Sequence, residues 1–124
     1  MAVAIREGKE LNLLGAEWIA SATHRTGITA VDTVDPPTVA SGVNCRDYMQ
    51  CRFDIVKNSG TVTTLEVQIL FWNSKQGAFM RGSKLEVDEL PKAIVTDVRG
   101  AIVFLKVTKL EGTTPNISID YSLS

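Results

Sequence analysis

The sequence has few of the residues that enzymes and metal centres most often use. Among its 124 residues there is one histidine, His24, and there are two cysteines, Cys45 and Cys51. A structural zinc site usually takes four ligands, so these three residues do not predict one. His24 lies in the polar stretch 21–27, with no acid or nucleophile at a fixed spacing beside it. The composition therefore predicts a protein with no catalytic activity, no metal and no cofactor.

Loops of the kinds that bind phosphate or calcium are also missing. None of the nine glycines belongs to a G-x-G-x-x-G or a G-x-x-x-x-G-K-[ST] motif. A calcium loop needs closely spaced, alternating acids, and the acidic residues of this chain lack that spacing. We interpret the following acids as ordinary solvated side chains: Asp32, Asp35, Glu86, Asp88 and Glu89.

Neither the charge nor the hydrophobicity of the chain points to a nucleic acid or a membrane. The formal net charge is −1, and the basic residues form no run that would attract a polyanion. No apolar stretch approaches the roughly 20 residues that span a bilayer. The first residues also lack the ordered regions of a secretion signal. We therefore expect a protein that is made in the cytosol and binds neither partner directly.

The two cysteines leave two interpretations open. On one continuous strand Cys45 and Cys51 would lie about 20 Å apart, whereas a disulfide needs Cα atoms within about 7 Å of each other. A turn near Arg46 and Asp47 would bring the two together and make a bridge feasible. We favour two reduced thiols, with Cys51 acting as a small core residue.

What the sequence does contain is one alternating pattern that occurs twice. In residues 51–72, apolar and polar residues alternate on both sides of the turn residues 58–60. In residues 103–123, the same alternation surrounds Glu111 and Gly112. Each segment is typical of a half-buried antiparallel hairpin. The pattern therefore predicts two hairpins whose apolar faces cover each other in one core.

The two segments align with a shift of 52 residues. Such a match has two explanations, an internal duplication or the general likeness of any two amphipathic hairpins. The matched positions include Cys51 with Val103, Phe53 with Leu105, Ile55 with Val107, and Gly60 with Gly112.

The rest of the chain predicts further short strands. Breaks at Gly, Ser and Pro leave room for them near residues 78–81, 84–87 and 93–98. Residues 8–24 fit either a helix or a strand, and we favour a strand because Gly15 weakens a helix by ~1 kcal/mol. We predict an all-β protein with a single domain, an antiparallel β-sandwich or jelly roll of seven or eight short strands. It would span residues 11–124 and follow an N-terminal arm, residues 1–10.

Some apolar residues fall on the outward side of the predicted strands. They share that side with polar residues such as Gln68 and Lys106. Either loops of the same chain cover them, or they contact a partner. The candidate interface residues are Trp18, Leu70, Trp72, Ile102 and Phe104.

The closing stretch, residues 95–124, resembles a pattern in small β-sandwich structural proteins of tailed bacteriophages. The resemblance consists of an Arg-Gly strand start, an alternating strand, the turn Gly-Thr-Thr-Pro and a final alternating strand. Residues 41–69 are compatible with the same plan. The resemblance implies a virion component that coats the capsid or joins head to tail, often as a symmetric oligomer. It carries over no site residues, because the pattern matches strands and turns.

These observations lead to a non-enzymatic virion structural protein, assembled in the host cytoplasm. We expect a capsid decoration or cement subunit that forms a homo-oligomer and binds the major capsid protein. A head–tail connector or a tail component, bound to head–tail proteins, is the alternative. An alternative of another class is a carbohydrate-binding module that stacks sugars on aromatic residues: Trp18, Tyr48, Trp72 and Tyr121.

Overall fold

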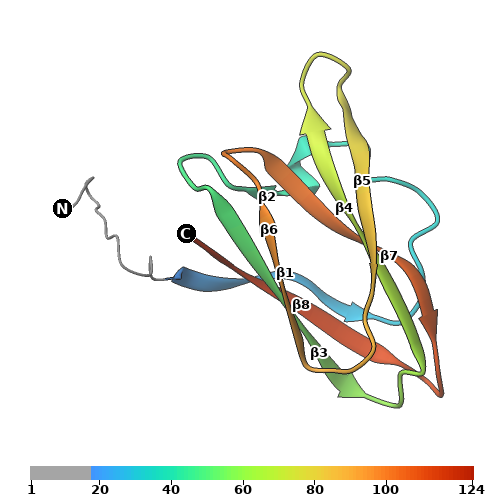
Figure 1. Ribbon diagram of the computed structural model, residues 1–124. Coiled ribbons are helices and arrows are strands. Elements are labelled where there is room, and N and C mark those ends of the chain that lie inside the picture. Colours follow the sequence, from blue (N-terminus) through green and yellow to red (C-terminus); the bar gives the residue numbers. More distant parts are fainter. Residues whose placement is uncertain (1–17) are drawn as a thin grey trace.

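The chain is built almost entirely of β-strands in the computed structural model, which describes residues 18–124 (Figure 1). A single short 3-10 helix, η1 (Val39–Ser41), interrupts the strands in this part of the chain. The strands are β1 (Ile19–Ile28), β2 (Val43–Asn44), β3 (Gln50–Ser59), β4 (Thr64–Asn73), β5 (Ala78–Glu86), β6 (Lys92–Asp97), β7 (Ile102–Glu111) and β8 (Asn116–Leu123).

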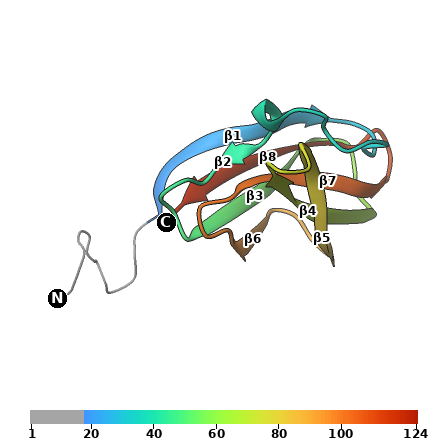
Figure 2. The same ribbon diagram turned by 90° about the horizontal axis from the view of Figure 1, so that it is seen from above.

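The eight strands form two four-stranded antiparallel sheets that pack face to face (Figure 2). One sheet has the order β1-β8-β3-β6, and the other has the order β2-β7-β4-β5. The pairs are nested: β1 pairs with β8, β2 with β7, β3 with β6, and β4 with β5. This nesting is the arrangement of a jelly roll. The predicted all-β sandwich is therefore confirmed.

The predicted hairpins, in contrast, are wrong. The strands β3 and β4 lie in different sheets, and so do β7 and β8. Residues 60–63 and 112–115 carry the chain from one sheet to the other, so each segment is an arch. The alternating pattern tells which face of a strand is apolar. It does not tell whether the next strand pairs edge to edge in the same sheet or lies in the opposite sheet and packs against the apolar face.

Two further strand predictions are settled by the structure. Within residues 8–24, residues 19–24 are strand, because β1 begins at Ile19. The two short strands predicted within residues 78–87 are one strand, β5, with a bulge opposite residues 68–70 of β4. The predicted arm, residues 1–10, lies outside the described residues.

The two arches explain why one pattern occurs twice, because each supplies the pairing partners of the other. Strand β3 pairs with β8, and β4 pairs with β7. The 52-residue shift also maps one register onto the other. The pair Cys51 and Leu123 corresponds to the pair Val103 and Phe71. The doubled sequence pattern is thus a doubled pairing pattern around one core.

The turns of the two arches bind each other at one end of the sandwich. The Thr61 amide donates to the Thr113 carbonyl at 3.0 Å, and the Thr113 amide donates to Thr61 Oγ1 at 2.9 Å. Gly60 and Gly112 have φ angles of 75° and 152°, a region that favours glycine. A side chain at either glycine would collide with the backbone of the other arch.

The core lies between the sheets and is filled from the inward side of the strands. Its most deeply buried side chains include those of Phe53, Ile55, Leu65, Val67, Val103, Leu105, Val107, Ile117 and Ile119. These are positions of the alternating segments, so the predicted inward faces are confirmed.

Because the two turns are in contact, replacing Gly60 with alanine should be costly. A Cβ atom there would overlap the carbonyl oxygens of Thr113 and Thr114. We expect Gly60→Ala to lower the free energy of unfolding by more than about 2 kcal/mol in denaturant titrations. Gly77→Ala is the matched control, since Gly77 has a φ of 64° with no heavy atom near the added carbon. It should cost only about 1 kcal/mol, and equal losses in the two variants would contradict the contact.

Candidate functional site

Side chains and one backbone amide, and not a strand, satisfy much of the outer edge of β7. Its neighbour β2 is so short that it pairs only with Ile102 and Val103. Beyond it, His24 Nε2 accepts a hydrogen bond from the Leu105 amide at 3.1 Å. Arg25 Nη1 donates to the Leu105 carbonyl at 3.2 Å. A buried edge with unsatisfied groups would be costly, so these contacts protect β7.

Asp32 continues this edge from the connection between β1 and β2. Its amide donates to the Val107 carbonyl at 2.9 Å, and its Oδ2 accepts from the Val107 amide at 2.8 Å. Both carboxylate oxygens also accept from Arg25, at 2.6 and 2.7 Å. The two side chains are each 19% exposed. Asp32, which we interpreted as a solvated acid, is therefore a structural group held by two partners.

His24 is packed between aromatic rings and is neutral. Its ring centroid lies 5.5 Å from that of Phe53 and 5.0 Å from that of Phe104. Burial and the neighbouring Arg25 lower the pKa of His24 from 6.5 to about 4, although Asp32 opposes the shift. The neutral ring can accept from the Leu105 amide, whereas the protonated ring cannot. The arrangement therefore lets His24 satisfy a backbone amide at the edge of β7.

The chain itself covers part of the predicted interface. Leu70 is 0% and Phe104 is 8% exposed, and the two form a second apolar cluster with Phe79 on the outer face of β2-β7-β4-β5. Arg25 lies over the Phe104 ring, at 5.0 Å. Leu70 and Phe104 are therefore covered within the chain itself and are not exposed, as a contact surface would require.

Asp35 ties the β1–β2 connection to the same outer face. It accepts from Lys106 Nζ at 2.7 Å and from Arg81 Nε at 3.0 Å. These hydrogen bonds, that of Lys106 first, lower the pKa of the Asp35 carboxyl. No sequence signal could have paired Asp35 with residues 46 and 71 positions away.

The remaining interface candidates are accessible in part. Trp72 is half-buried and packs edge-to-face on Phe79, at 5.0 Å between ring centroids. Ile102 is half-buried beside it on β7. Trp18 is half-buried over the Arg52 guanidinium, at 5.2 Å, on the outer face of the other sheet. For Trp18, Trp72 and Ile102 the interface stays a prediction.

The aromatic residues do not form a common surface for a sugar. Trp18 and Trp72 lie on the outer faces of different sheets. Tyr48 and Tyr121 pack against the main core. Four residues that are separated in this way offer no shared stacking platform.

An apolar cleft opens on the side of the sandwich opposite the capped edge. There, β5 and β6 are the free edge strands of the two sheets, and a cleft of about 190 Å³ lies between them. Leu85 and Ile94 line it from the two edges, and Phe53 and Leu105 line it from the core. Leu85 is 44% exposed, so the apolar interior of the sandwich reaches the surface here.

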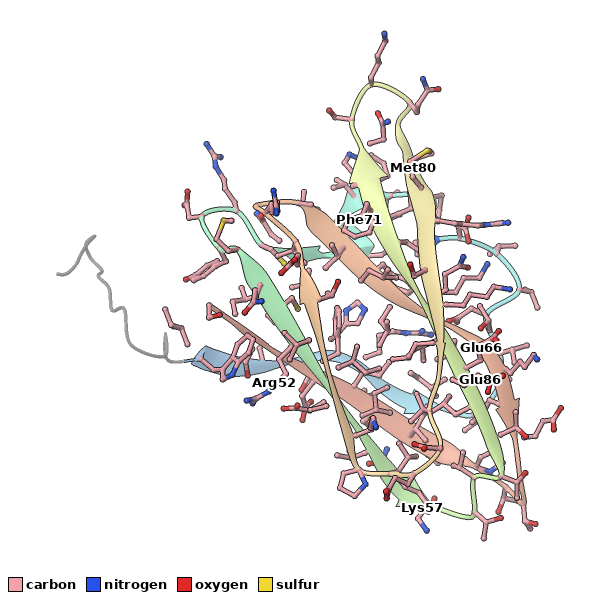
Figure 3. All side chains as sticks on the ribbon, in the orientation of Figure 1. Arg52, Lys57, Glu66, Phe71, Met80 and Glu86 are labelled. Atoms are coloured by element: carbon pink, nitrogen blue, oxygen red, sulfur yellow. The ribbon has the colours of Figure 1, made fainter. Side chains whose placement is uncertain are left out.

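The hairpin of β4 and β5 extends this apolar surface beyond the cleft. It projects past the rest of the sandwich (Figure 1). Phe71 and Met80 are register partners near its tip, and Figure 3 shows both side chains there. Met80 is 40% exposed. Alternation places Phe71 on the inward face, and its half-buried side chain packs against the main core.

Two classes of site receive no support from residues 18–124. No group of three histidine, cysteine, aspartate or glutamate residues in this part of the chain is placed to hold a metal ion. The same residues include no helix long and apolar enough to cross a membrane.

The neutral state of His24 makes stability depend on pH. Because its pKa is lower in the folded than in the unfolded chain, the unfolded chain binds the proton more readily between pH 6.5 and about 4. The free energy of unfolding should therefore fall by roughly 3 kcal/mol as the pH drops through this window. His24→Gln keeps an acceptor for Leu105 but does not titrate. Urea unfolding at pH 7 and pH 4.5 should show a smaller loss for this variant, and equal losses would contradict the assignment.

The ion pair between Asp32 and Arg25 should be worth far more than an exposed one. We expect Asp32→Asn to lower the free energy of unfolding by about 3 kcal/mol, since Arg25 would keep a largely buried charge. Asp54→Asn is the control, because it removes an ion pair with Arg52 whose side chains are 28% and 32% exposed. Its cost should stay below about 1 kcal/mol. A loss of similar size in both variants, measured by denaturant unfolding, would contradict the capping role of Asp32.

Comparison with known proteins adds a likeness of fold. No protein-family model and no curated protein matches the chain. A similar solved structure is the crystal structure of SPBc2 prophage-derived protein YomS. The TM-score is 0.56, the match covers 85% of this chain and 92% of that chain, and the sequences are 14% identical. At this low identity, the comparison shows a shared fold and no more. In the chain described above, that fold is an eight-stranded β-sandwich.

Proposed function

We propose that the protein is a structural subunit of a tailed-phage virion that acts by binding and not by catalysis. Its place would be on the capsid, as a decoration subunit. The observation that carries the proposal is the apolar cleft between the free edges of β5 and β6, together with the projecting β4–β5 hairpin.

Those features suit an assembly protein because they leave apolar surface uncovered beside unpaired backbone. The exposed edge residues Met80, Leu85 and Val95 are 40%, 44% and 51% exposed. An extended segment of a neighbouring virion protein could add to one edge and place apolar side chains in the cleft. Lys84 and Glu86 on the exposed β5, and the bulge in that strand, would discourage indiscriminate pairing. β6 therefore offers the more open edge.

Two likenesses support a phage origin. The sequence of residues 95–124 resembles β-sandwich structural proteins of tailed phages, and the similar solved structure is a prophage-derived protein. A fold by itself does not identify a function. The cleft supplies the feature that a binding role needs.

The mechanism of a decoration subunit is mass action. A subunit that binds the assembled shell better than its free components stabilises the shell by RT ln(1 + [L]/Kd) at each site. Symmetry repeats the site over the shell, so that modest contacts add up. The chain would then form a regular array or oligomer on the capsid.

The test starts from purified virions of the phage or induced prophage that encodes the chain. Quantitative mass spectrometry should find the chain at a copy number comparable to that of the major capsid protein, and immunogold labelling should mark heads. A low copy number with label at the neck or tail would replace the capsid role by a connector or tail role. Complete absence of the chain from virions would overturn the proposal.

A substitution in the cleft should then weaken incorporation. We expect Leu85→Glu, supplied in trans to phage that lack the wild-type gene, to reduce the copies per virion about tenfold or more, because a charge would enter the apolar contact. Val34→Glu is the matched control. Val34 is 70% exposed in the β1–β2 connection, away from the cleft. Both variants should show unchanged thermal unfolding, and equal incorporation would exclude the cleft as the contact surface.

A further inference from the structure

The two cysteines come from opposite sheets of the sandwich. Cys45 directly follows β2, which belongs to the sheet β2-β7-β4-β5. Cys51 lies on β3, in the middle of the opposite sheet. Both side chains are 0% exposed and belong to the same core cluster. Both are free thiols, as the sequence predicts.

A tight turn brings the two residues together. The Tyr48 amide donates to the Cys45 carbonyl at 2.9 Å, and Asp47 takes a left-handed φ of 73°. The Cys45 amide is held in turn by the Ala101 carbonyl, at 3.1 Å. Cys51 is held by pairing on both sides, with β6 and with β8. The backbone on either side of the thiols is therefore fixed, and the chain reverses direction between them.

The two thiols are buried in one core cluster and interact with each other. Cys45 Sγ donates to the Val43 carbonyl at 3.6 Å. The interaction with Cys51 lowers the pKa of Cys45, whereas the interaction with Cys45, followed by burial, raises the pKa of Cys51. Cys45 is thus the thiol that ionises first. It also lies next to the exposed residues Asn44 and Arg46, through which a reagent could approach on local opening.

We propose that Cys45 and Cys51 are a redox site that closes to a disulfide between the two sheets when the protein meets a small-molecule disulfide. The Cys45 thiolate attacks one sulfur of the reagent, whose S–S bond breaks and releases one small thiol. The Cys51 thiolate then attacks the Cys45 sulfur of this mixed disulfide and releases the second small thiol. The pair loses two electrons and two protons, and the reagent gains them.

The bridge would fasten the sandwich where the chain crosses between its sheets. A disulfide stabilises chiefly by restricting the unfolded chain. The inference does not depend on the proposed function. For a virion protein, however, the reducing cytosol would keep the two thiols reduced during assembly. The disulfide would then form after release and hold the two sheets together.

The experiment uses the full chain and oxidised glutathione under native conditions at pH 8. Intact-mass measurement after alkylation should show the loss of two hydrogens, with no bound glutathione and no alkylated thiol. The Tm should rise by about 5 °C or more, and dithiothreitol should reverse it. A stable glutathione adduct, or oxidation that occurs only in denaturant, would overturn the proposal.

The variant Cys51→Ser separates the two chemical steps. It should stop at the mixed disulfide, with one glutathione on Cys45 and no rise in Tm. Glutathione on neither residue of this variant, while the wild type oxidises, would overturn Cys45 as the attacking thiol. Because a buried serine could impair folding, the wild-type measurement alone decides whether the disulfide forms.

Discussion

The mutual pairing of the two arches is the constraint on which the rest of the structure depends. Neither arch could stand alone, because its two strands lie in different sheets and share no ladder. Each strand gains its backbone partners from the other arch, in a register that the 52-residue shift preserves. The glycine turns of the two arches bind each other, so that the core is closed at that end. The other four strands then add at the margins of this central unit.

The two sides of the sandwich differ in how these margins are finished. On the β1 and β2 side, β2 is too short to protect β7, and His24, Arg25 and Asp32 occupy the edge instead. On the β5 and β6 side, no such cover exists within residues 18–124, and apolar residues reach the surface. The residues on the first side are therefore used to satisfy the backbone of the sandwich itself, whereas the second side keeps exposed apolar surface. This asymmetry is the basis of the proposed binding role.

Sequence reasoning succeeded where the physical cause is local and failed where it is not. The inward positions of the alternating segments, such as Phe53 and Leu105, are buried as predicted. The hairpins were wrong because alternation is the same for a strand that pairs and a strand that stacks. Leu70 and Phe104 were taken for contact residues because their neighbours along the strand are polar. Arg25, almost 80 residues away, lies over the Phe104 ring.

The sequence by itself determined that the chain is an all-β sandwich, which faces of its main strands are apolar, and where glycine allows the chain to turn, since each depends on neighbouring residues alone. Only the tertiary structure decided which strands pair, what covers the outer cluster, and that Cys45 and Cys51 are buried in the same core. It also decided where the core is left open. These outcomes depend on groups far apart in the chain, and contact between such groups is a property of the folded molecule.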